Sequence, residues 1–398
     1  SMQRALILGV LWAMASGATA AEGVDQPQFG GPDAVDNQVQ EDAARDWKSD
    51  LRDRVGLSLG LDYSSNYFKA SDSLVKDEAW GGMARFYGSW DVVNRGEPDA
   101  GALVWKFEHR HRSGDLAPQG LASQLGYAGL IGPPFSNEGF RFTNLYWRQR
   151  LNDGRSTLIA GFLDATDYLD VYALASPWTG FNNFAFSTGT QTIPVANDAT
   201  LGVAFGTMLT DQMFLIAGLT DTNSDPTDLG ETVESFFDDH EYFKSVEIGL
   251  TQSQGRIYMD NLHLTFWHVD ERKRAGTPKG WGLNASYTRF LGDRWMPFIR
   301  AGYAEDGGSL LEVAVSAGLG VTMREGRDVL GFAAHWGEPN SDTYGTDLKD
   351  QYVAELYYRF KVTDSIALTP DVQLLVDPAL NPEEDTLWVV GLRARIAL

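Results

Sequence analysis

Thirteen consecutive residues, from Leu311 to Met323, alternate strictly between two kinds of side chain. One set is apolar and contains Leu311, Val313, Val315, Ala317, Leu319, Val321 and Met323. The other set is small or polar and contains Glu312, Ala314, Ser316, Gly318, Gly320 and Thr322. Because successive side chains of a β-strand point to opposite faces, this segment predicts a strand with one apolar face. Its length exceeds that of an ordinary globular strand and suits a tilted strand that crosses a membrane.

The same alternation recurs from Val55 onward, where Val55, Leu57, Leu59, Leu61 and Tyr63 are separated by Gly56, Ser58, Gly60 and Asp62. Sixteen such segments can be placed, and they begin near residues 55, 79, 101, 140, 156, 200, 213, 242, 260, 280, 295, 311, 328, 350, 365 and 385. The pattern predicts an all-β fold, namely a transmembrane antiparallel β-barrel of about sixteen strands around a polar lumen.

The connections between these segments differ in length according to their order. Short turns follow even-numbered strands at residues 152–155, 210–212, 291–294 and 324–327, whereas the longest connections, residues 113–139, 168–199 and 221–241, follow odd-numbered ones. Outer-membrane barrels have short periplasmic turns and longer extracellular loops, so the lengths support a barrel. Aromatic residues near the strand ends either form interfacial girdles or belong to an ordinary core: Tyr67, Phe68, Trp80, Trp90, Phe290, Trp295, Trp336, Tyr358 and Trp388.

The amino-terminal end has a different pattern. Arg4, the apolar run 5–15 and the small residues 18–20 are typical of an export signal, so we expect residues 1–20 to be removed. Residues 21–54 are expected to form a periplasmic segment, and residues 35–54 within it could form a short helix with Val39, Ala43, Trp47 and Leu51 on one side. The barrel would then occupy residues 55–398.

Composition excludes several other classes of protein. The chain has no cysteine, which excludes a disulfide scaffold and thiol catalysis. Beyond the signal there is no run of 18 apolar residues, so a helical membrane protein is disfavoured. The formal net charge of −22 disfavours binding to nucleic acid, because the phosphates would be repelled.

Strand parity assigns a set of charged and aromatic side chains to the lumen. A charge that faces lipid near the bilayer midplane costs about 2–4 kcal/mol, which selects the inward register. The side chains assigned inward are Arg85, Lys106, Glu108, Arg110, Arg148, Glu247, Trp267, Arg300, Glu312, Glu355, Arg359, Arg393 and Arg395. This mixture of signs suits a neutral ligand rich in hydroxyls, since a hydroxyl both donates and accepts. Alternatively, these charges pair with one another and hold water.

The connection 168–199 is rich in aromatic residues and glycine. It holds Tyr168, Tyr172, Trp178, Phe181, Phe184 and Phe186, and Asp164, Asp167 and Asp170 lie at its start. We expect this loop to fold inward as the constriction, with Asp164 and Trp178 on the path of the permeating molecules, because the apolar faces of a hydroxyl-rich ligand can stack on aromatic rings. Alternatively, the aromatic side chains only attach the loop to the barrel wall.

Motifs for other chemistry are weak. Asp221, Asn223 and Asp225 resemble the start of a calcium loop, but Pro226 stands where the glycine of the turn should be. His109 and His111 share a face, which parity makes the outer one. There is no nucleophile elbow and no HExxH motif. We therefore predict no metal site, no cofactor and no enzymatic activity.

Several segments in fixed order resemble a known family. They are LIAGFLDATDYLD (158–170), FNNFAF (181–186), GLTDTNSDP (218–226), DNLHLTFWHVD (260–270), WMPFIRAGYA (295–304), QYVAELYYRF (351–360) and LTPDVQLLVDPALNP (368–382). Together they resemble the OprB-like carbohydrate-selective porins over residues 47–398, most strongly in the carboxyl-terminal third. The resemblance implies a 16-stranded barrel that admits sugars by diffusion, with a constriction lined by charged and aromatic side chains. Such barrels usually end on Phe, whereas this chain ends on Leu398.

The expected function is passive, carbohydrate-selective diffusion of mono- or small oligosaccharides across the bacterial outer membrane. The alternatives are a general or ion-selective porin, and a barrel for polysaccharide export or envelope structure. The expected partners are permeating sugars, outer-membrane lipid, lipopolysaccharide and the barrel-assembly machinery. The sequence leaves open whether the barrel is a monomer or a trimer.

Overall fold

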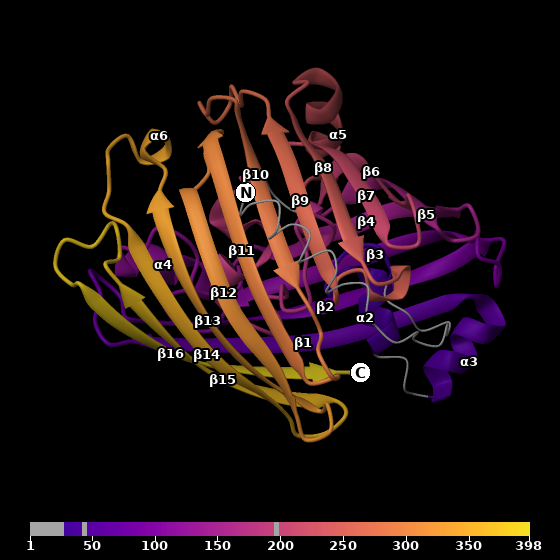
Figure 1. Cartoon of the computed structure of the whole chain (residues 1–398), viewed down its shortest axis with the longest axis horizontal. Helices are drawn as coiled ribbons and strands as arrows, with labels where there is room; N and C mark the ends of the chain where they lie inside the picture. The colour runs from indigo at the N-terminus through magenta and orange to yellow at the C-terminus, as the bar shows by residue number, and fades with distance from the viewer. Residues whose placement is uncertain (1–27, 42–45, 195–198) are drawn as a thin grey trace, which may run out of the picture.

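The computed structural model of the chain describes residues 28–41, 46–194 and 199–398. These residues form sixteen strands that close into one antiparallel barrel, in which every strand pairs with its neighbours in the chain and β1 pairs with β16 (Figure 1). The strands are β1 Leu57–Ala70, β2 Glu78–Val93, β3 Gly101–Arg112, β4 Gly139–Leu151, β5 Ser156–Leu163, β6 Thr200–Met208, β7 Met213–Asp221, β8 Tyr242–Thr251, β9 Asn261–Val269, β10 Gly280–Thr288, β11 Trp295–Asp306, β12 Leu311–Met323, β13 Asp328–Pro339, β14 Gln351–Lys361, β15 Ile366–Val376 and β16 Thr386–Ala397.

The strands begin where the alternation of side chains predicts. The largest difference is at β1, which begins at Leu57 and not at residue 55, because a helix continues through Val55. The predicted fold class and strand number are confirmed.

The outer surface of the barrel is apolar. Val315, Phe332 and Val390, for example, are 38%, 53% and 52% exposed on three different strands. Such a belt is stable only against lipid, so it marks the membrane-facing side. Two of the candidate girdle residues do not belong to this belt, since Phe68 is buried on the inner face and Phe290 lines an internal cavity.

Helices are few and short. They are α2 Val35–Glu41 and α3 Asp46–Val55 before the barrel, and α4 Leu121–Leu125, α5 Leu229–Asp238 and α6 Ser341–Tyr344 within the long loops. Short 3-10 turns lie at Pro118–Gly120, Ala165–Asp167, Phe184–Phe186, Thr188–Gln191 and Gln254–Arg256. No helix among the described residues is long and apolar enough to cross a bilayer.

The amino-terminal region differs in detail from expectation. Of the helix expected over residues 35–54, the structure describes α2 and α3, and residues 42–45 between them lie outside the described residues. Val35 is fully buried in one apolar cluster with Tyr87 and Val104, which lie on the inner faces of β2 and β3. Residues 28–41 therefore lie inside the barrel, and we call them the N-terminal lumen segment. The expected export signal and Ala43 lie outside the described residues.

The two ends of the barrel are unlike each other. The helices α5 and α6 lie at the end that carries the long loops, at the top of Figure 1, and the chain ends at the opposite end, among the short turns. Two long loops also turn inward: residues 113–138 after β3, and residues 164–194 after β5, which we call the constriction loop. The buried side chains of both loops form shared clusters with inward side chains of the strands. The core of the molecule is therefore the filled lumen.

Candidate functional site

Trp178 of the constriction loop lies where two strands and a second loop meet. Its indole stacks on Phe135 of loop 113–138, with the ring centroids 5.4 Å apart. The guanidinium carbons of Arg85 on β2 and Arg110 on β3 each lie 5.7 Å from the centroid of the same indole. The aromatic loop and the inward arginines thus converge on one place, which the residues alone left as one of two possibilities.

The arginines beside Trp178 are held by carboxylates on the barrel wall. Arg85 donates to both oxygens of Asp62 on β1, at 2.9 and 2.5 Å. Asp62 also accepts from Arg395 on β16, at 2.9 and 2.8 Å. Arg110 donates through two nitrogens to Glu108, at 3.0 and 2.7 Å. Paired guanidinium groups keep a fixed direction, so their remaining N–H groups are preoriented donors.

One of those donors has no hydrogen-bond partner among the described residues. Arg85 is 1% exposed, and its Nη1 atom is buried without an acceptor. A buried N–H group that lacks an acceptor costs free energy, so an acceptor supplied by a ligand would be favourable there. Together with the indole, this geometry suits a ligand that offers both hydroxyl oxygens and apolar C–H groups.

The constriction loop is attached to the far wall by a buried charge network around Asp170. Its carboxylate accepts from Arg300 on β11 and lies against Nε2 of His263 on β9, both at 2.6 Å, while its backbone N–H donates to Glu247 on β8 at 2.8 Å. Burial alone would raise the pKa of Asp170, but the charge of Arg300 and the hydrogen bond from His263 outweigh burial and lower that pKa. Arg300 and Glu247 are therefore parts of a loop attachment.

A second attachment fixes the tip of the constriction loop. Arg393 on β16 donates to the carbonyl oxygens of Pro177 and Gly180, at 3.0 and 2.8 Å. Glu355 on β14 accepts from the backbone N–H groups of Asn182 and Asn183, at 2.5 and 3.0 Å. These contacts flank Trp178 in the sequence, so Arg393 and Glu355 position the indole.

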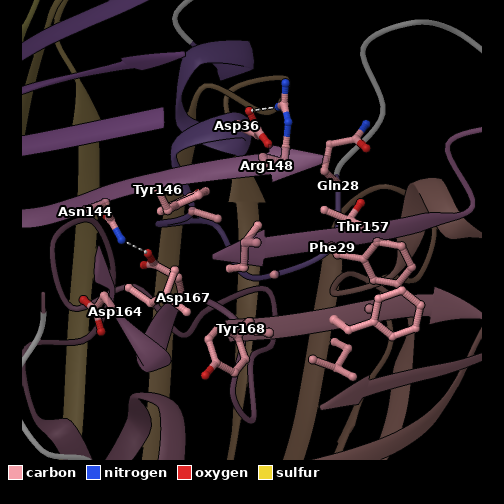
Figure 2. A pocket seen from close by; sticks show the side chains of 18 of the residues that line it. Gln28, Phe29, Asp36, Asn144, Tyr146, Arg148, Thr157, Asp164, Asp167 and Tyr168 are labelled. Atoms are coloured by element: carbon pink, nitrogen blue, oxygen red, sulfur yellow. Dashed lines mark hydrogen bonds and ion pairs between the residues drawn. The ribbon is translucent and has the colours of Figure 1, made fainter. Parts of the chain in front are cut away.

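Two other predicted charged side chains, Lys106 and Arg148, contact the N-terminal lumen segment. Asp36 pairs with Arg148 on β4 (Figure 2), and Arg148 also donates to Asp91 at 2.7 Å. Lys106 on β3 donates to the carbonyl oxygen of Asp33 at 2.7 Å. Lys106 and Arg148 thus each contact a segment that the sequence pattern placed in the periplasm.

Gly31 brings this segment against the constriction loop. Its N–H donates to the carbonyl oxygen of Asp167 at 2.6 Å, and a Cβ atom at Gly31 would lie 2.9 Å from a methyl group of Val171. Asp167 lines a pocket beside this contact, with Tyr146 and Arg148, and accepts a hydrogen bond from Asn144 at 3.3 Å (Figure 2). Burial raises the pKa of Asp167 well above its usual range.

The remaining sequence-predicted residues have other contacts. Asp164 caps the turn at Ala165–Asp167 by accepting from the N–H of Thr166 at 3.0 Å. Trp267 is buried and stacks on Phe243 of the neighbouring strand, with the ring centroids 6.1 Å apart. Arg359 lines a cavity at the short-turn end of the barrel.

Sequence patterns did not single out several residues of the site. Phe135 comes from a loop without periodicity, and Asp62 was seen only as the polar partner in an alternating strand. The signal for Asp62 was available, since a carboxylate on the inward face of β1 needs a partner cation once it is buried.

Comparisons with known proteins identify similar sequences and similar folds. Residues 271–398 match the carbohydrate-selective porin, OprB family. The high-pH structure of Pseudomonas putida OprB superposes with a TM-score of 0.68 at 15% identity, covering 95% of this chain and 100% of that one. Acinetobacter baumannii DcaP and a loop-deletion mutant of Vibrio cholerae OmpT each give a TM-score of 0.53, at 11% and 14% identity, over 86% of this chain and 97% and 99% of theirs. No curated protein matches the sequence.

These findings concern both the membrane in which the barrel lies and the family that its sequence resembles. A closed barrel with an apolar outer belt satisfies its backbone hydrogen bonds internally, as a membrane-spanning sheet must, and its fold is that of outer-membrane channels. The resemblance seen in the sequence is confirmed: the carboxyl-terminal third of the chain matches the OprB family of carbohydrate-selective porins, on a barrel with the fold of P. putida OprB.

Proposed function

We propose that the protein is an outer-membrane porin through which small neutral sugars diffuse, and that they are selected at the constriction around Trp178. The observation that carries the proposal is the pair of guanidinium groups 5.7 Å from one indole, of which Arg85 keeps a donor without a partner. A sugar ring can lie against the indole while its hydroxyl oxygens accept from the arginines and its hydroxyl protons are donated to Glu108.

The mixed charge of the constriction supports sugars over ions. Arg85 and Arg110 are each matched by a carboxylate, so the site carries no large net charge of either sign. An ion-selective filter concentrates one sign of charge, whereas a neutral polyol needs donors and acceptors side by side. Release follows because few groups contact the sugar, and no catalytic step is part of the proposal.

The remaining predicted residues have supporting roles in this proposal. Arg300, Glu247, Arg393 and Glu355 hold the constriction loop, and Lys106 and Arg148 hold the N-terminal lumen segment. We also propose that residues 1–20 are an export signal, that the barrel-assembly machinery inserts the barrel, and that outer-membrane lipid and lipopolysaccharide surround its belt.

Single-channel recording tests the proposal. We expect glucose to reduce the current through the full chain in a planar bilayer in a saturable manner. In the Trp178→Ala variant we expect glucose to bind about tenfold more weakly, because the sugar loses its aromatic platform. Trp295→Ala is the matched control, since it removes an indole that is exposed on the outer face. A wild-type current that no mono- or oligosaccharide reduces would show a general porin or an export barrel instead.

A further inference from the structure

A second cavity lies in the lumen between the N-terminal lumen segment, the constriction loop and the barrel wall. Its lining includes Asp33 and Gln38 of that segment, Thr322 and Gly326 beside the turn between β12 and β13, and Arg359 on β14. Because that turn is one of the short ones, the cavity lies at the periplasmic end of the barrel. Its free volume is about 240 Å³, whereas one water needs only roughly 10–15 Å³ on the same measure. The cavity has room for a ligand the size of a monosaccharide.

Arg359 is the unusual group in this cavity. Most of the other inward arginines of the strands, such as Arg85, Arg148 and Arg300, pair with carboxylates. Arg359 has neither an ion pair nor a hydrogen bond among the described residues. Asp33, the one acidic side chain in the lining, already accepts from Ser176 at 2.6 Å. The other arginine in the lining, Arg395, is held by Asp62 at 2.8 Å. The Arg359 guanidinium thus forms no ion pair with a described carboxylate, although Asp33 lines the same cavity.

A second polar atom in the cavity also lacks a partner. Gln38 is 6% exposed, and its Oε1 atom is buried without a hydrogen-bond donor. An unsatisfied buried acceptor is uncommon in folded proteins, and a ligand hydroxyl would satisfy it. Apolar side chains complete the lining, among them Phe290, Leu174 and Tyr357. One cationic donor, one free acceptor and apolar walls are the elements of a site for an acidic polyol.

We propose that this cavity is a second saccharide site at the periplasmic exit, and that it binds sugars that carry a carboxylate. The carboxylate lies against Arg359, whose two terminal nitrogens match its two oxygens, and a hydroxyl donates to Oε1 of Gln38. The inference rests on the proposed function, because it places the site on the same path that sugars follow through the lumen. It extends the range of permeants from neutral sugars to sugar acids.

The experiment uses the full chain in a planar bilayer, with gluconate added on the side of the short turns. We expect gluconate to reduce the current in a saturable manner and the Arg359→Gln variant to bind it at least about tenfold more weakly, since a charge-assisted pair is lost. Gln38→Leu should also weaken gluconate while leaving the charge unchanged. Arg327→Gln is the matched control, because Arg327 is exposed in the neighbouring periplasmic turn and its loss changes the net charge equally.

The outcomes separate this site from the constriction. Equal effects of Arg359→Gln and Arg327→Gln on gluconate binding would overturn the proposal, because gluconate would then respond to the overall charge of this end and not to a specific site. Equal reduction of the current by acetate and by gluconate would overturn it too, because the polyol would not be recognised. Glucose serves as the independent probe. If Trp178→Ala weakens the effect of glucose but Arg359→Gln leaves the effect of gluconate unchanged, only this inference fails. If gluconate acts through Arg359 and glucose never reduces the current, the neutral-sugar function fails and the anion site stands.

Discussion

At the scale of single residues, Asp62 joins two arginines in the wall around the constriction. Its carboxylate is fully buried and accepts from both Arg85 and Arg395. Removing one member of a buried charge group leaves the others uncompensated, which costs about 3–5 kcal/mol. We therefore expect Asp62→Asn to lower the free energy of unfolding by that amount in urea titrations of the barrel in lipid vesicles, followed by tryptophan fluorescence.

An exposed pair of the same chemistry is the control for Asp62. Asp211 pairs with Arg155 between two periplasmic turns, and its side chain is 91% exposed. An exposed pair contributes about 0–1 kcal/mol, so Asp211→Asn should leave the urea midpoint almost unchanged. Similar losses for the two variants would mean that the lumen is wet enough to screen Asp62, contrary to its burial.

At the scale of elements, substitution of two aspartates three residues apart in the constriction loop should change the thermal midpoint in opposite directions. Asp170 is paired with Arg300, and its pKa is lowered, whereas burial raises the pKa of Asp167. At neutral pH, Asp170→Asn removes favourable charge interactions and should lower the thermal midpoint. Asp167→Asn removes a carboxylate whose ionised form is disfavoured by burial and should raise the midpoint.

The pH dependence of the two aspartates follows from the same directions. The lowered pKa of Asp170 gives stability that is present above the usual value of 3.8 and is lost as the pH falls through the folded value. The raised pKa of Asp167 gives stability that is present below 3.8 and is lost as the pH rises through the folded value. In the Asp167→Asn variant, the thermal midpoint should therefore not show this loss of stability as the pH rises. If the midpoints of the variant and of the wild type change with pH in the same way, the assignment to Asp167 is wrong.

The strands could be predicted from sequence much further than the loops. Lipid on one side and polar groups on the other impose a period of two on each strand, so Leu311–Met323 fixes its own bounds. Its inward face follows the alternation only from Val313 onward, because the register shifts between Leu311 and Val313 and Leu311 is fully buried. The inward loops have no such period. The contact between Trp178 and Phe135 joins two loops, and no local pattern encodes it. The N-terminal lumen segment was missed for the same reason, because its partner Arg148 lies on β4 and far from it in the chain.

A local irregularity also limits what parity can predict. Lys106 pairs with Asn144 but Phe107 pairs with Phe142, so Thr143 is an extra residue in β4. The bulge reverses the parity of the strand, and Arg141 and Arg148 are both buried although they stand seven positions apart. A bulge of this kind cannot be recognised from composition, yet beyond it every side chain of the strand points to the opposite face from the one that parity predicts.

At the scale of the whole molecule, the net charge of −22 is distributed unevenly between the two ends of the barrel. Loop 222–241 contains seven acidic residues and no lysine or arginine, and loop 377–385 contains four acidic residues and no base. The short turns mix the two signs, as in Arg324, Glu325 and Arg327. Since the lumen charges are largely paired, the acidic loops set the electrostatic potential at the extracellular mouth.

This asymmetry predicts an ion selectivity that depends on which end faces dilute salt. The Debye length is about 30 Å at 0.01 M and about 10 Å at 0.1 M, so the acidic loops attract cations only when the dilute solution lies on their side. We expect the reversal potential in a tenfold KCl gradient to show cation preference in that orientation and much less in the other. Neutralising Glu231, Glu234 and Asp238 on α5 should reduce the preference, whereas neutralising Asp153, Asp211 and Asp364 in the short turns, which changes the net charge equally, should not. Equal selectivity in both orientations would place the controlling charges inside the lumen, and the paired arrangement of Arg85, Asp62 and Glu108 could not then account for it.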